Sequence, residues 1–200
     1  HEWNYDGIRK VIGTDKDNSY SVKISSDGTG VVEFNNKIYD AANFEIKNAT
    51  VVFGKSVTDT TGGFDSDMLS KKVALTMNNA TLDAANGYIE NIRVSTLTSM
   101  ENTTNTIRLD VDVSKLMADH LVIRDELTGN INVAFNMIGG GLFDNTVWFA
   151  DLLDVPGYSF TLIDDTITIG DIEYTLELAQ DYNAFNEHNL YGVKFASRLL

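Results

Sequence analysis

The chain has 200 residues, of which 43% are hydrophobic, and it carries 29 acidic against 15 basic side chains, for a formal net charge of -14. This length and composition suffice to bury a core in one elongated domain or two small ones. A field of this sign repels phosphate backbones and anionic lipid headgroups, so we expect no nucleic-acid partner and no peripheral membrane attachment. The lack of cysteine is compatible with a bacterial secreted protein.

The predicted elements are almost all strands. Runs of Val, Ile, Thr, Phe and Tyr alternate with polar residues and are separated by Gly, Asn and Asp turns. No apolar run reaches the roughly 18 to 20 residues of a membrane-spanning helix. The pattern is typical of an all-β protein, and only residues 65–71 and 181–188 favour a helix. In chain order we expect strands at 20–25, 30–35, 43–53, 72–77, 88–97, 106–113, 120–124 and 130–136.

A nine-residue segment occurs twice, 43 residues apart. Residues 35–43 (NNKIYDAAN) return as 78–86 (NNATLDAAN), with the Asn pair and the closing Asp-Ala-Ala-Asn at the same internal spacing. Self-similarity at a fixed offset is typical of stacked repeats, so we predict a β-solenoid, a right-handed parallel β-helix in which two coils of roughly 20 to 22 residues span the offset. An ordinary β-sandwich with two Asn-rich turns is the alternative.

The Asn pairs would lie at coil corners, because Asn tolerates left-handed backbone angles and can bond to its counterpart in the next coil. These corner residues are Asn35, Asn36, Asn78 and Asn79. Strand alternation assigns the other side of the chain to the core. The inward residues predicted in this way are Ile38, Phe44, Ile46, Val51, Phe53, Leu75, Met77, Leu82, Ile89, Ile92 and Val94.

The pattern changes beyond Tyr158. Three alternating segments at 158–163, 166–169 and 172–178 are separated by Asp-Asp and Gly-Asp, which are tight-turn sequences. They predict antiparallel hairpins. Such hairpins would cap the C-terminal end of the solenoid, where the last coil otherwise leaves backbone edges and core open to water.

Four motifs follow one another in this last part of the chain: residues 116–123 (LMADHLVI), 127–133 (LTGNINV), 160–162 (FTL) and 169–176 (IGDIEYTL). Their order and approximate spacing resemble the end of the passenger domain of autotransporters, the pertactin-like β-helical proteins of Gram-negative envelopes. The chain departs from that family in having no Trp in its last strand and in a more elaborate loop before Tyr158.

The resemblance implies a non-enzymatic passenger fragment, with β-helix coils at 1–115 and an autochaperone-like cap at 116–200 that continues the helix and nucleates folding. It implies secretion to the cell surface through an outer-membrane barrel in the full-length protein, and adhesion or display toward a host or neighbouring-cell surface protein or glycan. Since His1 stands first, we expect a piece of a longer polypeptide. The folding-nucleus residues would be Leu116, Ala118, Asp119, Leu121, Gly129, Phe160, Leu162, Gly170, Tyr174 and Leu176.

Asp110 and Asp112 are the candidate catalytic pair. They alternate on one strand, as the paired carboxylates of a carbohydrate-active β-helix would, whether a polysaccharide lyase, a glycosidase or a tailspike-like protein. We interpret them instead as the solvated face of a strand whose Leu109, Val111 and Val113 are buried. On this interpretation the protein has no catalytic residues.

Metal ligands are not apparent in the sequence. His1, His120 and His188 share no ligand spacing, and His120 is expected on the surface of a strand. Residues 15–19 begin like a calcium loop, but the glycine and the glutamate that such a loop requires do not follow. We therefore expect neither a metal nor a cofactor.

Overall fold

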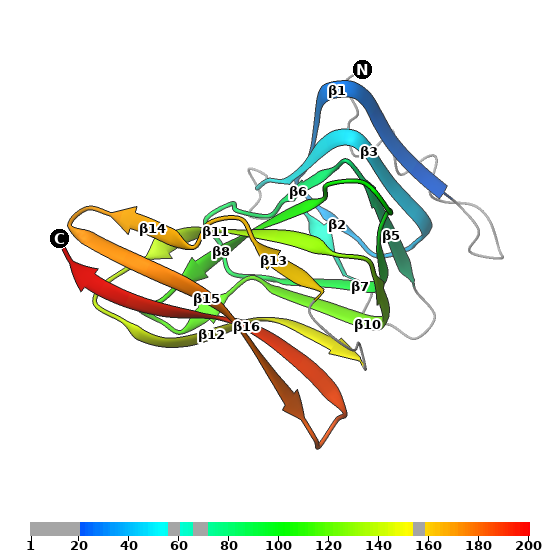
Figure 1. Ribbon diagram of the computed structural model, residues 1–200. Helices are drawn as coiled ribbons and strands as arrows, with labels where there is room; N and C mark the ends of the chain where they lie inside the picture. The colour runs from blue at the N-terminus through cyan, green and yellow to red at the C-terminus, as the bar shows by residue number, and fades with distance from the viewer. Residues whose placement is uncertain (1–20, 56–60, 66–71, 154–158) are drawn as a thin grey trace.

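The structure is a computed structural model, and it describes residues 21–55, 61–65, 72–153 and 159–200. All regular structure in these ranges is β-strand, and the strands stack into a β-solenoid of about five turns (Figure 1). The predicted all-β solenoid is thus confirmed. The strands are β1 Ser21–Phe34, β2 Lys37–Ile38, β3 Ala41–Phe53, β4 Gly63–Phe64, β5 Val73–Asn78, β6 Thr81–Asp83, β7 Asn91–Ser99, β8 Thr106–Asp112, β9 Met117–Ala118, β10 His120–Thr128, β11 Ile131–Gly139, β12 Asp144–Leu153, β13 Phe160–Leu162, β14 Thr166–Ile169, β15 Ile172–Asn183 and β16 His188–Leu199.

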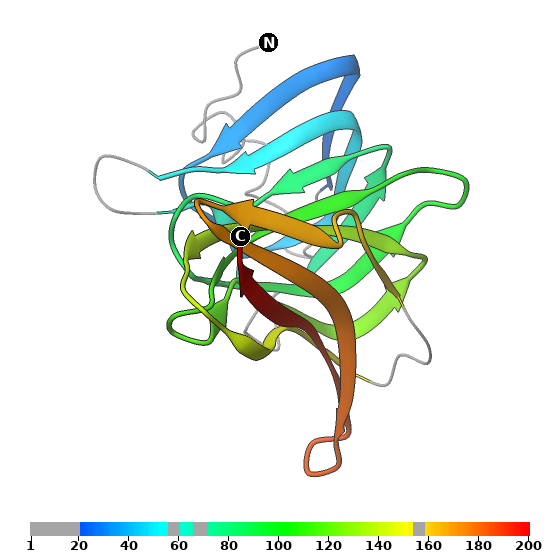
Figure 2. The same cartoon turned by 60° about the vertical axis from the view of Figure 1, so that its left-hand side comes forward.

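The coils run along three faces of parallel strands. Face 1 joins the first part of β1 to β3, β5, β7 and the end of β10. Face 2 joins the second part of β1 to β3, β6, β8, β11 and β13. Face 3 contains β2 paired with β4, and the first part of β7 paired with β10 and then β12. The long strands β1 and β3 bend across the corner between faces 1 and 2 (Figure 2).

The core consists of columns of inward side chains, one from each coil. On face 1 the register aligns Val22, Phe44, Leu75, Leu97 and Leu127, all buried. Alternation along a strand turns every second side chain toward the same side, so in-register stacking produces such columns automatically. Of the predicted inward residues, all are buried except Ile89, which is half-buried.

Aromatic side chains link neighbouring coils near the N-terminal end of the core. Phe44 packs edge-to-face on Phe34 at 6.0 Å and on Phe64 at 5.0 Å between ring centroids, and Phe64 packs on Phe53 at 5.3 Å. These four rings come from three strands, β1, β3 and β4. Edge-to-face pairs add a directional term to simple burial, which fixes how adjacent coils sit on one another.

The two copies of the repeated segment do not stack, so the predicted alignment is wrong. Asn78 pairs with Lys47, and the residue one coil away from Asn79 is Asn48. Asn48 and Asn79 both have φ near 50° and form the corner between faces 1 and 2, as expected of a left-handed corner. Residues 35–36 instead connect β1 to β2 at the corner between faces 2 and 3.

The coils are also less uniform than predicted. Along the face 1 column, Phe44 lies 22 residues after its partner Val22, whereas Leu75 lies 31 residues after Phe44. The extra residues lie between β3 and β5, so the two strands still pair in parallel, with one shift of register between Ala41 and Phe44, while the connection lengthens. An offset of 43 residues is therefore not a multiple of any coil in this stack.

The C-terminal cap is antiparallel, as predicted, but its strands are not the three that were expected. β14 pairs with β15, β15 with β16, and β16 with β12 of the last coil, all antiparallel. β13 does not join this hairpin, because it pairs in parallel with β11 and completes face 2. Residues 181–188, expected to be helical, are the end of β15, a turn and the start of β16.

Substitution of Phe44 by Ala should lower the free energy of unfolding by about 3 to 5 kcal/mol, since it removes a fully buried ring from the column. Leu162→Ala should cost clearly less, because Leu162 is the half-buried last rung of the face 2 column. Urea denaturation of both variants measures the difference. Equal losses would contradict this placement of Leu162.

Candidate functional site

The acidic pair of strand β8 is buried, so the interpretation of a solvated strand face is wrong. The exposed fraction of Asp110 is 0% and that of Asp112 is 6%. The physical reason is that the turn at Gly87 and the short strand β9 close over this end of β8. The apolar neighbours of the pair in β8 and just beyond it are buried, as expected.

Asp110 is held by hydrogen bonds on both carboxylate oxygens. Its Oδ2 accepts a hydrogen bond from the backbone N–H of Gly87 at 2.7 Å, and its Oδ1 accepts one from Nδ2 of Asn136, also at 2.7 Å. Gly87 lies in the connection between β6 and β7, and Asn136 lies on β11. The carboxylate therefore ties β8 to an irregular segment on one side and to the next coil on the other.

Asp119, which lies between β9 and β10, likewise links β8 to an irregular segment through hydrogen bonds to its carboxyl group. Its Oδ2 accepts a hydrogen bond from the backbone N–H of Asp110 at 2.7 Å, and its Oδ1 accepts one from that of Glu90 at 2.9 Å. Its own N–H donates to the carbonyl of Asp110 at 2.9 Å. Burial raises the pKa of the Asp119 carboxyl group to about 7, against these two backbone hydrogen bonds, which lower it.

Polar contacts continue outward from both carboxylates. Arg108 donates to Asn136 Oδ1 at 3.3 Å and forms an ion pair with Asp83 at 3.4 Å. At the other end, Glu90 forms an ion pair with Lys37 at 2.7 Å and accepts a hydrogen bond from the hydroxyl of Thr61. We call this set the carboxylate network: Lys37, Thr61, Asp83, Glu90, Arg108, Asp110, Asp119 and Asn136.

In the carboxylate network, Asp110 and Asp119 satisfy backbone N–H groups of the protein. Both oxygens of Asp110 and of Asp119 accept hydrogen bonds from the protein, and the two side chains are closed off from solvent. Asp112 accepts hydrogen bonds from the Ser114 hydroxyl and from the Lys115 N–H. A general acid or nucleophile must reach its substrate, so these carboxylates do not form a glycosidase pair.

Two of the three histidines approach one carboxylate. His188 Nδ1 lies 2.6 Å from Asp151 Oδ1, joining β16 to β12. Burial lowers the pKa of His120, on the adjacent strand β10, and the nearby Asp151 opposes that shift. Sequence spacing gave no sign of this cluster, since the cap brings β16 beside β12. Within the described ranges no group of His, Asp or Glu has the arrangement of a metal site, while His1 and residues 15–19 lie outside them.

The motif residues proposed for a folding nucleus occupy three kinds of position. Gly129 and Gly170 have positive φ angles of 83° and 58°, in turns. Leu162 is half-buried, and Leu116 stands apart, since it is 54% exposed and has a φ of 57°. The remaining members are buried: Ala118, Asp119, Leu121, Phe160, Tyr174 and Leu176.

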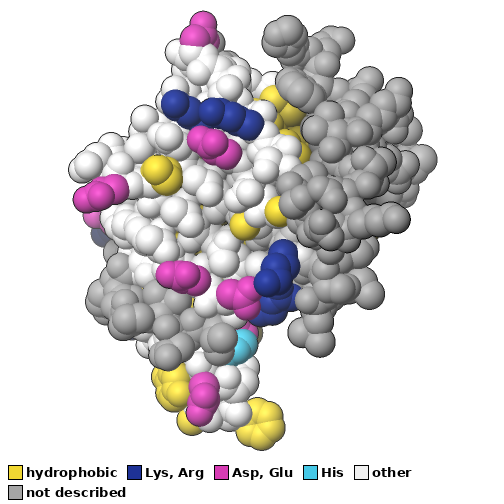
Figure 3. Space-filling view, turned by 90° about the vertical axis from the view of Figure 1, so that its right-hand side faces the viewer, with side chains coloured by type: hydrophobic (Ala, Val, Ile, Leu, Met, Phe, Trp, Pro, Cys, Tyr) yellow, Lys and Arg dark blue, Asp and Glu magenta, His cyan; other side chains and the backbone are white. Residues whose placement is uncertain are grey.

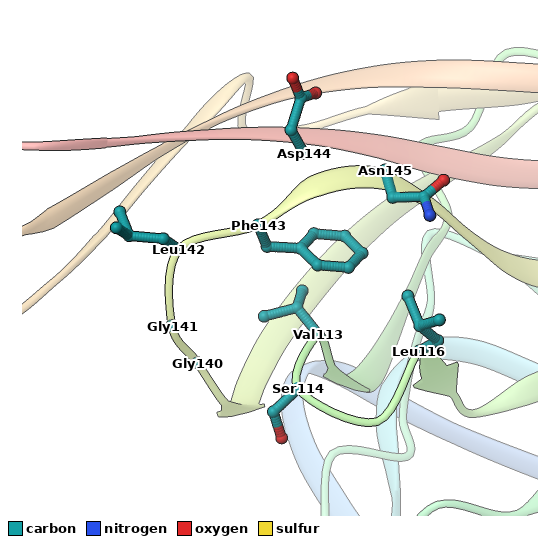
Figure 4. Close-up of a pocket in the computed structure, with 9 residues that line it drawn as sticks. All are labelled: Val113, Ser114, Leu116, Gly140, Gly141, Leu142, Phe143, Asp144 and Asn145. Atoms are coloured by element: carbon teal, nitrogen blue, oxygen red, sulfur yellow. The ribbon is translucent and has the colours of Figure 1, made fainter.

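Among the residues that the structure describes, two open grooves on the coil stack stand out. The first, which we call the loop groove, has a volume of about 450 Å³ and lies between the turn 113–116 and the loop 140–145 (Figure 4). The second, of about 420 Å³, lies at the corner between faces 1 and 2 and is lined largely by Asn and Thr of residues 99–105 and 129–132. Neither groove contains the Asp110 and Asp112 pair.

The fold and these sites define the chain as a β-solenoid scaffold with a buried polar network. Comparison with known protein families and with characterised proteins gives no match. Over the residues that the structure describes, no helix has the length and apolar character needed to cross a membrane.

The buried Asp119 should make stability depend on pH. The pKa of this carboxyl group is 3.8 ordinarily and about 7 in the folded protein. Between pH 4 and 7 the folded state therefore binds more protons than the unfolded state. The protonated group's contribution to the free energy of unfolding is present at pH 4 and is lost as the pH rises through 7. The slope cannot exceed about 1.4 kcal/mol per pH unit for one proton. Urea denaturation of wild type and Asp119→Asn from pH 4.5 to 8 gives the free energy of unfolding of each as a function of pH, and the difference between the two isolates the contribution of Asp119. A constant difference would contradict the raised pKa.

Proposed function

We propose that this chain is a non-enzymatic scaffold of the bacterial cell surface, the C-terminal part of an autotransporter-like passenger that serves in adhesion or display. The observation that carries the proposal is the enclosure of Asp110 and Asp112, the only paired carboxylates that suggested catalysis. Both oxygens of Asp110 and the Oδ1 of Asp112 accept hydrogen bonds from backbone or side-chain donors of the protein itself. Binding by exposed surfaces is then the function that such a scaffold best supports.

The surface of the stack supports a display role. Among the described residues on the flank seen in Figure 3, acidic and basic side chains are interspersed. The hairpin of β15 and β16 projects away from the coils (Figures 1 and 2). Near its tip Tyr182 and Phe185 are 53% and 99% exposed, as aromatic anchors of binding surfaces often are before they meet a partner.

The cap supports a role in folding. β16 pairs with β12 along nearly its whole length, so the edge of face 3 is covered by backbone hydrogen bonds. Tyr191 and Phe195 of β16 and Tyr174 of β15 are fully buried. A sheet that both closes the edge and buries rings can form early and template the last coil, which is the role that we propose for residues 116–200.

The proposed export places the full-length protein outside a Gram-negative cell after passage through an outer-membrane barrel, with a surface protein or glycan of a host or neighbouring cell as partner. Labelling of intact cells with antibodies against this chain tests the location. We expect labelling before lysis. Signal that appears only after lysis, with a periplasmic marker behaving the same way, would contradict surface display.

Catalysis is tested by incubating the chain with acidic and neutral polysaccharides. We expect neither new reducing ends nor unsaturated products, because the paired carboxylates cannot reach a sugar. Wild type and Asp110→Asn are compared under the same conditions. Turnover that is lost in Asp110→Asn, with thermal unfolding showing that the variant remains folded, would establish a carbohydrate-active enzyme instead.

The folding role predicts a kinetic effect of Tyr174→Phe. The Tyr174 hydroxyl accepts a hydrogen bond from Gly141 N at 2.9 Å and donates to Gly141 O at 2.8 Å, so its removal should cost about 1 to 3 kcal/mol. If the cap nucleates folding, most of that cost should appear as slower refolding in stopped-flow measurements. Phe44→Ala, in the N-terminal coils, should mainly accelerate unfolding. The reverse pattern would contradict the proposed nucleus.

A further inference from the structure

The loop groove combines exposed apolar side chains with a fixed framework. In Figure 4 the ring of Phe143 lies over Val113, with Leu116 on the facing turn and Leu142 at the outer end. Leu116 is 54% exposed and Leu142 65% exposed, whereas Val113 is buried and forms the floor. The Phe143 and Leu116 side chains face the space above Val113, whereas the Leu142 side chain points outward from the loop. Exposed apolar groups around a concave surface are typical of a site that another molecule covers.

Leu116 is held in a backbone conformation that its side chain disfavours. Its φ of 57° lies in the left-handed region, at the last position of the turn that joins β8 to β9. Gly or Asn fits this position without strain, whereas a Leu with its Cβ does not. Because the Leu116 side chain remains largely exposed, burial in its own fold does not offset the strain. An apolar side chain kept under such conditions indicates a role at the surface.

The opposite wall is tied down by the cap. The Gly141 N–H donates a hydrogen bond to the Tyr174 hydroxyl at 2.9 Å, and the same hydroxyl donates to the Gly141 carbonyl at 2.8 Å. The N–H of Phe143 donates to the Ser197 hydroxyl at 2.5 Å, and the Phe143 ring packs edge-to-face on Phe195 with centroids 6.2 Å apart. A wall fixed in this way is preformed, so a ligand need not order it on binding.

The same contacts indicate what the groove accepts. The N–H groups of Gly141 and Phe143 are already engaged within the protein. Asp144 is exposed and stands at the rim, while Lys115, the basic residue of the facing turn, is paired with Asp112 at 3.8 Å. With a net charge of -14 on the chain, a positively charged partner is favoured and a second copy of the chain is not.

We propose that the loop groove binds a protein segment that inserts one apolar side chain between Leu116 and Phe143 and carries a positive charge beside Asp144. This inference rests on the proposed binding role and names its site and the chemistry of its partner. It does not depend on the export route, which the surface-labelling experiment tests separately.

The experiment titrates the ¹⁵N-labelled chain with the peptide acetyl-Lys-Leu-Phe-Lys-amide and follows the amide signals of Gly140, Gly141 and Ser114. We expect saturable shifts at millimolar peptide, at least tenfold weaker binding of acetyl-Glu-Leu-Phe-Glu-amide, and no saturable shifts with acetyl-Lys-Ser-Ser-Lys-amide. Equal binding of the basic and acidic peptides would overturn the assigned charge preference. Absence of any saturable shift would overturn the site.

Leu116→Asn is the informative variant, because Asn suits the left-handed position. It should reduce peptide binding at least tenfold while thermal unfolding occurs at the same or a higher temperature. Val31→Ser is the matched control: Val31 is 65% exposed, like Leu142, and lies on β1 at the far end of the stack, so binding should be unchanged. Unaltered binding by Leu116→Asn would refute the proposal. Concentration-dependent dimerisation that Leu116→Asn abolishes, without peptide binding, would identify a second copy as occupant and refute it as well.

Discussion

The hydrogen bonds of Asp110 and Asp119 hold the coil stack together where its strand ladders are interrupted. Between β6 and β7, and again around β9, the chain leaves the parallel ladders, and the backbone N–H groups of Gly87, Glu90 and Asp110 receive side-chain acceptors instead. A buried N–H without an acceptor costs about 1 to 3 kcal/mol. The carboxylates thus replace a missing strand, which allows a solenoid to change the length of its coils without exposing or losing its core.

That structural role and an enzymatic role exclude each other at the same atoms. A carboxylate that accepts hydrogen bonds on both oxygens is fixed and desolvated, and the raised pKa of Asp119 reflects the cost of this burial. The two acidic residues that suggested a catalytic pair do alternate on β8. The sequence could not reveal that β9 and the Gly87 turn cover it, because both contacts arise only when separate coils are stacked.

The sequence pattern predicted those features that depend on neighbouring residues of a single strand. All but one of the side chains that period-two alternation assigned to the core are buried, since a strand must place every second residue on one face. The repeated Asn-Asn segment was less informative, because Asn suits a left-handed corner of any kind, and Asn79 and the pair at 35–36 occupy different corners. β13 was assigned to a hairpin for a related reason. Its turn sequence permits one, but the column that ends in Val133 and Leu162 selects parallel pairing with β11.

The strained Leu116 and the loop fixed by the cap form opposite walls of the loop groove. Docking of the cap and binding in the groove are therefore connected. The loop between β11 and β12 forms one wall of the loop groove, and it is fixed by Tyr174, Phe195 and Ser197 of the cap. Until β15 and β16 dock, this wall has no partner to set its shape, so the groove forms only in the folded protein. A ligand that binds only that state stabilises the cap by mass action. Occupation of the groove should then favour the same strands that close the end of the solenoid.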